Sequence, residues 1–253
     1  MFGIYLHGSG VTTTVVRRSL LHDNNAPGAA SGNGIYSDQG AVGITIAANR
    51  FEDHANAGVI FANAGVVQQQ IVIRNNRSLN DNTFVALFDV QQAQVVANRF
   101  NDTVDTDDFG STIFVGGDTD GILVQNNVLR NPGFAGIAVR DTLGVVGAMN
   151  VRLLGNTVTG AEGSGIDVTA AGTAAVTVRN NTLNNNGVGS PGEHRDGIRF
   201  GPDTDGNQIR ANIATGNAEF DCHDESTGTG TFGTANTWAN NDGGTDQPNG
   251  ICP

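Results

Sequence analysis

The chain has 253 residues and a net charge of −12, from 25 acidic and 13 basic residues, and every basic residue is an arginine. Nucleic acids and anionic membranes repel so acidic a chain, which excludes them as general partners; binding a polyanion needs a local arginine patch or a bridging cation. With 38% hydrophobic residues, 6% aromatic residues and 36 glycines, the composition favours a narrow solenoid over a core of large side chains. No stretch is long and apolar enough for a membrane span.

Short β-like phrases recur along the chain about every 27 residues. In chain order they begin at Ile4, Ile35, Val59, Phe84, Ile113, Ile137, Ile166, Ile198 and Phe220, most of them directly after a glycine. A second inward position follows two residues after each of these. A repeat with this alternation predicts nine strands that each bury one face, stacked as the rungs of a solenoid.

Each rung carries a second strand that ends in a fixed pattern: apolar, x, apolar, x, x, Asn, x, apolar. The pattern occupies 44–51 in the second rung and 176–183 in the seventh. Its polar position holds Ser19, Asn49, Asn76, Asn98, Asn127, Asn156, Asn181, Asn212 and Asn236. Asparagine suits a bend because it tolerates the left-handed conformation. Stacked rungs should therefore place these amides in a hydrogen-bonded ladder along the axis.

These repeats resemble the right-handed parallel β-helix superfamily, which includes pectate and alginate lyases, polygalacturonases, mannuronan epimerases and phage tailspikes. The resemblance covers essentially the whole chain and implies one all-β domain, 1–253, with about nine rungs. Residues 219–253 look like the final rung and C-terminal cap of secreted bacterial β-helix repeat proteins. Nothing precedes Gly3 and Ile4 to cover the first rung. We therefore expect the N-terminal cap to be missing, with upstream sequence or another subunit stacked on that rung.

The two cysteines, Cys222 and Cys252, lie close to the C-terminus and have no metal-binding spacing. A disulfide that ties down the C-terminus is the expected arrangement, with two separate buried thiols as the alternative. A disulfide implies an oxidising compartment, so we expect an extracellular or cell-surface protein whose signal peptide is not in this chain.

Charged residues concentrate on the outward positions of the first strand in the later rungs. The candidates for catalysis there are Arg140, Asp167, Arg199, Asp221 and His223. Three insertions, at 24–33, 101–110 and 184–196, fall at the same turn and predict a wall beside this sheet. The third brings Glu193, His194, Arg195 and Asp196 close to Arg199. Aspartates at the opposite turn form an acidic edge: Asp38, Asp89, Asp118, Asp141, Asp203 and Asp224. A sheet between two walls is a groove that suits a polymer.

Each candidate has a chemical role that fits polysaccharide. His223 or His194 can transfer protons near neutral pH, and Arg140 or Arg199 can hold a uronate carboxylate. A carboxylate pair such as Asp167 and Asp221 would serve a glycosidase. The third insertion's Arg195 and Asp196 are expected to contact substrate, and Tyr5 and Tyr36 are a candidate sugar-stacking platform. Because the chain has no lysine, the base of a lyase must be Arg, His or Tyr.

Two short motifs are similar to those of glycan-processing families. Phe220-Asp221-Cys222-His223 is similar to the Phe-Asp-Pro-His segment of mannuronan epimerases, which carries catalytic Asp and His; here Cys replaces Pro and the preceding tyrosine is missing. Asp107-Asp108 and the segment 118–121 resemble polygalacturonase motifs, but their order is reversed. The acidic turns are also compatible with bound Ca²⁺, although no calcium-binding nonapeptide or EF-hand loop occurs.

The sequence therefore predicts an extracellular β-helix protein that binds or processes polysaccharide, with uronate-containing chains among the candidate substrates. If it is an enzyme, it is a polysaccharide lyase, an epimerase or a glycoside hydrolase. The alternative is a non-catalytic adhesive, structural or filament-forming module, in which the charged side chains only form ion pairs between rungs. A third interpretation is the C-terminal half of a lyase.

Overall fold

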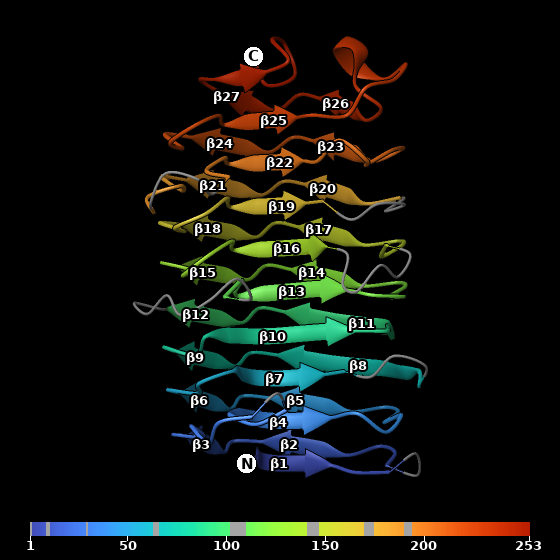
Figure 1. Ribbon diagram of the computed structural model, residues 1–253, viewed down its shortest axis with the longest axis vertical. Helices are drawn as coiled ribbons and strands as arrows, with labels where there is room; N and C mark the ends of the chain where they lie inside the picture. The colour runs from blue at the N-terminus through green and yellow to red at the C-terminus, as the bar shows by residue number, and fades with distance from the viewer. Residues whose placement is uncertain are drawn as a thin grey trace.

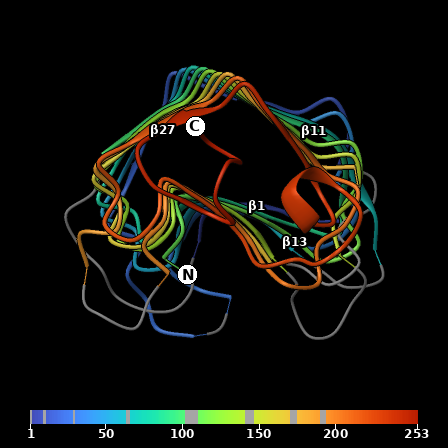
Figure 2. The ribbon, with the colours of Figure 1, turned by 90° about the horizontal axis from the view of Figure 1, so that it is seen from above.

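The structure, a computed structural model, describes residues 2–8, 11–28, 30–62, 66–101, 110–140, 147–169, 175–189 and 194–253. They form a rod of stacked turns that runs from the N-terminal end to the C-terminal end (Figure 1). Each turn contributes strands to three parallel sheets, named here A, B and C. Seen from above, the chain passes from A to B to C anticlockwise while it rises toward the viewer (Figure 2). The predicted right-handed parallel β-helix is confirmed.

The described strands are short and pair only with strands of the same sheet. Sheet A contains β1 (Phe2–Leu6), β4 (Asn33–Ser37), β7 (Ala57–Phe61), β10 (Thr83–Phe88), β13 (Ile113–Gly116), β16 (Ile137–Arg140), β19 (Ile166–Val168), β22 (Ile198–Phe200), β25 (Cys222–Asp224) and β28 (Asp246–Gln247). Sheet B contains β2 (Val15–Arg17), β5 (Thr45–Ala47), β8 (Gln68–Arg74), β11 (Val90–Val96), β14 (Leu123–Gln125), β17 (Arg152–Leu154), β20 (Thr177–Arg179), β23 (Gln208–Arg210) and β26 (Thr237–Ala239). Sheet C contains β3 (Leu20–His22), β6 (Arg50–Glu52), β9 (Arg77–Leu79), β12 (Arg99–Asn101), β15 (Val128–Arg130), β18 (Thr157–Thr159), β21 (Thr182–Asn184), β24 (Ile213–Thr215) and β27 (Asp242–Gly243).

The core fills the interior of the solenoid, where alternate residues of each strand point inward. Ile137, Ile166 and Ile198 of sheet A pair in register on successive turns, and all three are fully buried. Because neighbouring residues of a strand face opposite sides, an apolar residue at every second position builds a continuous inner wall. Burying each such side chain stabilises the fold by roughly 1.5–3 kcal/mol.

In β10 the inward positions differ by one residue from the predicted alignment. Val85, not Phe84, pairs with Val59 of the preceding turn. Phe84 lies at the corner before the inward positions, where its ring packs 5.8 Å from the ring of Phe51. Both alignments give an apolar residue at alternate positions, so the pattern alone could not separate them. As a result Ala86, rather than Val85, lies on the outer face of sheet A.

In the last rung the difference is two residues. Cys222, not Phe220, pairs with Ile198. The second inward position of β25 then belongs to Asp224, whose buried carboxylate accepts a hydrogen bond from the Trp238 indole at 2.6 Å. A charged residue is tolerated inside a core when donors satisfy its oxygens. The hydrophobic alternation therefore fails in this rung.

Asparagines form an axial ladder at the tight turn between sheets B and C. Each backbone N–H and side-chain amide donates to the side-chain oxygen in the next turn, and the same amide donates to a carbonyl in the preceding turn, as Asn127 does with Asn156 and Val95. The ladder consists of Ser19, Asn49, Asn76, Asn98, Asn127, Asn156, Asn181, Asn212 and Asn241. Asn241 takes the place predicted for Asn236. The left-handed residue of each turn is the one before the asparagine, for example Ala48 at φ 56°.

Shorter polar files occupy the other two turns. Between sheets A and B, Asn207 donates to the side-chain oxygen of Asn236 at 2.9 Å. Between sheets C and A, Asn186 donates to Asn217, and Asn217 donates to Asp221 at 2.7 Å. These files satisfy backbone groups that the turns would otherwise bury without partners. Asn236 therefore has an axial role, but in a different turn.

The C-terminal residues close the upper end of the described core. Cys222 and Cys252 form the expected disulfide, and both are buried. A single 3₁₀ turn, Thr231–Gly233, precedes β26. Trp238 of β26 packs edge-on against Phe200, with ring centroids 5.8 Å apart.

Asn127→Ala should destabilise the fold by about 1–3 kcal/mol, because the backbone N–H of Asn98 and the carbonyl of Val95 lose the Asn127 side chain as a partner, and the side-chain amide of Asn98 keeps only its bond to the Ile73 carbonyl. Urea denaturation of the variant measures the loss. Gln125→Ala, on the same turn with its side chain at the surface, is the control and should change stability by less than about 0.5 kcal/mol. Equal free energies of unfolding for the two variants would contradict a stabilising role of the asparagine ladder.

Candidate functional site

The outer face of sheet A presents a file of side chains that stand in register. From the N-terminal end the file contains Tyr5, Tyr36, Ile60, Ala86, Phe114, Ala138, Asp167, Arg199, His223 and Gln247. Adjacent members lie about 4.8 Å apart, which is the spacing of paired strands. The face therefore changes along the rod from tyrosines, through apolar side chains, to a charged end.

At the charged end, Asp167 of β19 joins two arginines from neighbouring turns. Arg140 Nε donates to Oδ2 at 2.9 Å and Arg140 Nη2 contacts the same oxygen, while Arg199 Nη1 donates to Oδ1 at 3.1 Å. The Asp167 side chain is only 1% exposed. Because the arginines occupy both carboxylate oxygens, Asp167 acts as an anchor that orients two cations. A glycosidase nucleophile or acid requires an oxygen that can reach the substrate.

Glu225 follows β25 and holds the other side of Arg199. Arg199 Nε donates to Glu225 Oε1 at 2.8 Å, and Nη2 lies 2.8 Å from the same oxygen. Burial is the largest influence on Arg199 and lowers its pKa, but the hydrogen bond to Glu225 and the charge of Asp167 outweigh it and raise the pKa overall. Arg199 is thus a fixed cation between two carboxylates. At this end of the chain of ion pairs solvent reaches Glu225, whose side chain is 28% exposed.

His223 lies between two carboxylates. Its Nδ1 is 3.3 Å from Asp196 Oδ2, and its Nε2 is 3.9 Å from Glu225 Oε1. Asp196 is fully buried and also accepts the backbone N–H of Phe220 at 3.1 Å, which fixes its position. Burial lowers the pKa of His223, but the hydrogen bond and charge of Asp196, with the charge of Glu225, raise it overall. A histidine oriented by a buried carboxylate is suited to proton transfer.

Three predicted residues lie apart from this cluster. Asp221 is not on the outer face: its carboxylate accepts hydrogen bonds from Asn217 at 2.7 Å and from the Gly244 backbone at 2.8 Å, so it ends an axial file. His194 is exposed, and its backbone carbonyl accepts a hydrogen bond from Ser164. Arg195 is half-buried in the same segment. Glu193, Asp141, Asp107-Asp108 and most of the 101–110 insertion lie outside the described residues.

Two members of the site, Glu225 and Phe134, were not predicted from the sequence. Glu225 lies two residues after His223, so the corrected register of β25 would have placed it on the outer face. Phe134 lies in the segment before β16, and the Arg140 guanidinium stacks over its ring at 4.5 Å. Such a cation–π contact positions Arg140 while leaving 23% of its side chain exposed. Nothing in the spacing of Phe134 marks it as a surface residue.

At the opposite end of the face, Tyr5 and Tyr36 converge on one carboxylate. The Tyr5 hydroxyl donates to Asp38 Oδ1 at 2.6 Å, and the Tyr36 hydroxyl donates to Asp38 Oδ2 at 3.2 Å. Burial, reinforced by the charge of Asp38, raises the pKa of Tyr36 to about 12. Tyr36 also stacks on Phe2 at 4.6 Å. The two tyrosines are brought together in an aromatic platform whose exposed ring is that of Tyr5, at 38% exposure, because Tyr36 is buried.

The middle of the face is apolar. Phe88 and Phe114 pack with ring centroids 5.0 Å apart, and Ala86 and Ala138 beside them are buried. Within the part of the chain that the structure describes, no three His, Cys, Asp or Glu side chains gather to hold a metal ion, so calcium has no assigned site there. None of the helices in that part is long and apolar enough to cross a membrane.

Comparison with known proteins identifies the fold. No protein-family model and no curated protein sequence matches the chain. It is similar to a tailspike protein of E. coli bacteriophage HK620, solved as a mutant in complex with a pentasaccharide, with a TM-score of 0.58 and 13% identity over 92% of this chain and 42% of that one. It is also similar to the A-module of the Azotobacter vinelandii mannuronan C-5 epimerase AlgE6, with a TM-score of 0.55 and 13% identity over 93% of this chain and 73% of that one. The likeness confirms the parallel β-helix fold, and this chain spans less than half of the tailspike chain.

His223→Gln should change how stability depends on pH. The raised pKa means that protonated His223 stabilises the fold fully below its unfolded pKa of about 6.5, and that this stabilisation is lost as pH rises through the folded pKa. Relative to the variant, the wild-type free energy of unfolding should therefore fall across that window. Urea denaturation between about pH 5 and pH 9 measures the difference.

The matched control is His194→Gln, because the His194 side chain is exposed. This variant should keep the wild-type pH profile. Parallel profiles for wild type and His223→Gln would show that the contacts of His223 with Asp196 and Glu225 do not favour the imidazolium.

Proposed function

We propose that this protein binds a polysaccharide along the outer face of sheet A. The single observation that carries the proposal is the straight in-register file from Tyr5 to His223, which puts an aromatic platform and a charged cluster on one face. Aromatic rings bury the apolar faces of sugar rings, while charged forks bind hydroxyl and carboxylate groups. A ligand that extends over several turns can use all of these groups at once.

The charged end supports a glycan that contains uronate. Arg140 is held by Asp167 and by the Phe134 ring, yet part of its guanidinium side chain reaches solvent. A pre-oriented guanidinium loses little conformational freedom when it binds a planar carboxylate. The names of the two similar structures support a glycan as the ligand, since one was solved with a pentasaccharide and the other is a mannuronan C-5 epimerase, and only the second name concerns a uronate polymer.

The disulfide supports a location outside the cytosol. Cys222 and Cys252 are bonded and buried beside the last rung. Disulfides persist in secreted and surface proteins and are rare in reducing compartments. A secreted or surface-bound glycan-binding protein is consistent with this chemistry.

A second candidate function, glycan processing, rests on His223 alone. Asp196 orients its Nδ1, and its Nε2 is directed toward Glu225 at the exposed edge of the cluster. This arrangement can deliver a proton to a bound sugar or remove one from it. Incubation with alginate and pectin, followed by ultraviolet absorbance for unsaturated uronate and by assay of reducing ends, tests for turnover. Absence of both products with every glycan would remove the lyase and hydrolase candidates, and an unchanged uronate composition of the recovered alginate by proton NMR would remove the epimerase, leaving the binding proposal in place.

Arg140→Gln should weaken the binding of tri- to hexameric oligouronates at least about tenfold, because it removes a charge-assisted hydrogen-bonding group worth roughly 1.5–3 kcal/mol. Binding of a neutral oligosaccharide should change little. Isothermal titration calorimetry measures both affinities. Arg152→Gln on sheet B, which removes the same charge far from the face, is the control and should bind oligouronates like the wild type. Wild-type affinity of Arg140→Gln, or no glycan binding by the wild type, would contradict the proposal.

A further inference from the structure

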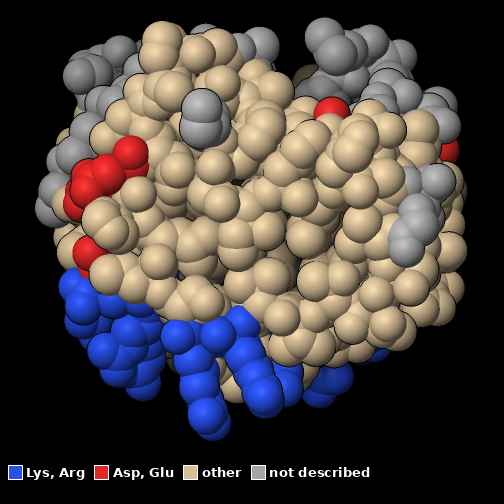
Figure 3. Space-filling view, turned by 90° about the horizontal axis from the view of Figure 1, so that it is seen from below, with Lys and Arg blue, Asp and Glu red and all other residues tan. Residues whose placement is uncertain are grey.

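The arginines of this acidic protein are segregated on sheets B and C. Of the 13 arginines, all except Arg140, Arg195 and Arg199 lie on these two sheets or in the tight turn between them. The strands of both sheets hold only two acidic residues in the described part of the chain, Glu52 and Asp242. Figure 3, a view of the N-terminal end, shows the arginines gathered along one side of the rod. This side is basic although the whole chain carries a net charge of −12.

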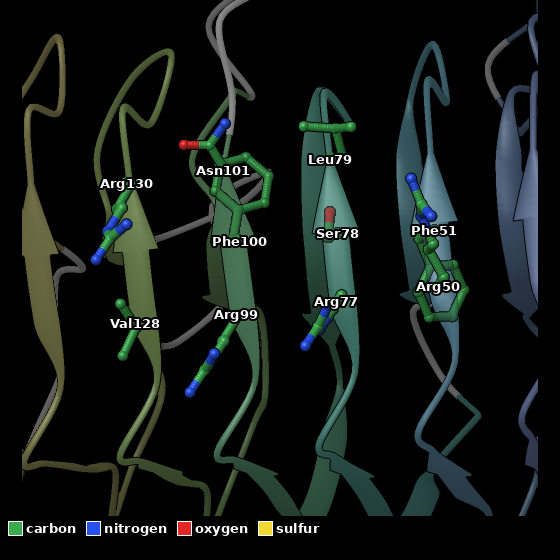
Figure 4. A pocket seen from close by; sticks show the side chains of 10 residues that line it. All are labelled: Arg50, Phe51, Arg77, Ser78, Leu79, Arg99, Phe100, Asn101, Val128 and Arg130. Atoms are coloured by element: carbon green, nitrogen blue, oxygen red, sulfur yellow. The ribbon is translucent and has the colours of Figure 1, made fainter.

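Three of these arginines stand directly opposite one another. Arg50 of β6, Arg77 of β9 and Arg99 of β12 pair in register on successive turns, and all are exposed. Figure 4 shows Arg77 and Arg99 side by side with their guanidinium groups turned the same way, whereas Arg130 on the next strand lies two residues further along, opposite Asn101. We refer to Arg50, Arg77, Arg99 and Arg130 as the arginine file.

Such a file is unfavourable for an isolated fold. Like charges directly opposite on paired strands, about 4.8 Å apart, destabilise a sheet. Within the arginine file, only Arg50 has an acidic partner among the described residues, and that partner is Glu52. This contrasts with the sheet A cluster, where each arginine meets a carboxylate. An external anion that bridges neighbouring arginines would remove the repulsion.

The surface beside the file has room for a ligand. A hollow of about 560 Å³ is lined by the arginine file together with polar and small apolar side chains such as Asn101, Leu79 and Val128. The two phenylalanines of these strands, Phe51 and Phe100, are buried and offer no exposed ring. The site is therefore a narrow row of donors on a sheet, with one cation per turn.

We propose that the arginine file is a second binding site, for a linear anionic polysaccharide that carries carboxylate or sulfate groups. Guanidinium forks bind both kinds of group through paired hydrogen bonds. A polymer with an acidic group on successive sugar rings can place its anions along the row, in step with the turns. This site is separate from the sheet A face and does not depend on the function proposed there.

Other polyanions fit these observations less well. Single-stranded nucleic acid relies on exposed aromatic rings to stack its bases, and the lining offers none. An anionic membrane is attracted by a basic surface as a whole, whereas a linear polymer that follows the rod can also use the in-register spacing of Arg50, Arg77 and Arg99. The polysaccharide is therefore the occupant that the geometry favours.

The double variant Arg77→Gln with Arg99→Gln tests the proposal against the control double variant Arg17→Gln with Arg152→Gln. Both lose two charges from exposed strand positions, but neither control arginine has another arginine directly opposite on a paired strand. The probes are heparin and polygalacturonate, with affinity measured by calorimetry from low to moderate salt in the Arg140→Gln background as well as in the wild type, so that binding at the site proposed on sheet A is told apart from binding at the file. We expect the file variant to bind at least tenfold more weakly, with a salt-dependence slope reduced by roughly 2, and the control to stay within about twofold of the wild type.

Thermal unfolding adds a second readout. Without probe, the file variant should melt at or above the wild-type temperature because repulsion is relieved, and heparin should raise its melting temperature much less than that of the wild type.

Equal weakening in both double variants, or no binding of either probe by the wild type, would overturn the proposal. Stronger file-dependent binding of single-stranded RNA or phosphatidylserine vesicles would also overturn it in favour of that partner. Arg140→Gln should leave heparin binding to the file unchanged, which separates this site from the one on sheet A.

Discussion

The hydrogen bonds that run along the solenoid axis at the turn between sheets B and C are the constraint on which the rest of the structure depends. Each ladder asparagine contacts the turn above and the turn below, so it fixes the vertical order of the turns as well as the bend. The residue before it adopts a left-handed conformation that costs an L-residue such as Ala48 or Ala97 roughly 1–2 kcal/mol. Because the ladder offsets this cost in every turn, the register cannot slip by one residue, and a slip would exchange inner and outer faces. The outer face of sheet A and the arginine file of sheet C both exist because that register is fixed.

The sequence was sufficient for the fold because inward positions and turn asparagines repeat at a period that few architectures share. It also predicted the side-by-side placement of Asp167 and Arg199, since both lie one residue after an inward isoleucine. It misplaced Asp221 because the last rung buries Asp224 where an apolar residue was expected, and no pattern reveals a carboxylate that an indole and nearby amides satisfy. Glu225 was missed for the same reason. The contact of Arg140 with Phe134 could not be predicted, because it depends on the path of a connecting segment.

The two arginine-containing surfaces solve opposite electrostatic problems. On sheet A the charges alternate along the chain of contacts Arg140, Asp167, Arg199 and Glu225, so each buried charge has a partner and the cluster is stable without a ligand. Only its outermost groups can exchange a partner for a ligand. On sheet C arginine is repeated in register without alternation at positions 50, 77 and 99, and of these three only Arg50 has a carboxylate partner among the described residues. Because the charges of sheet A are already paired, a ligand can bind there only through a few exposed groups, which favours selectivity. The repeated arginines of sheet C favour an affinity that grows with the length of the ligand.

Both surfaces are nevertheless spaced by the same ladder. Strand pairing sets one step per turn for the outer file of sheet A and for the arginine file of sheet C, so a ligand on either side meets groups at about 4.8 Å intervals along one direction. A compact ligand could use one or two steps, but only an extended polymer gains from many. The net charge of −12 restricts where a polyanion can bind, because it is attracted only where the arginines are concentrated and is repelled by the acidic turns elsewhere. At both proposed sites the regular spacing of the turns would favour extended chains, and the chemistry of each face would determine which chain binds there.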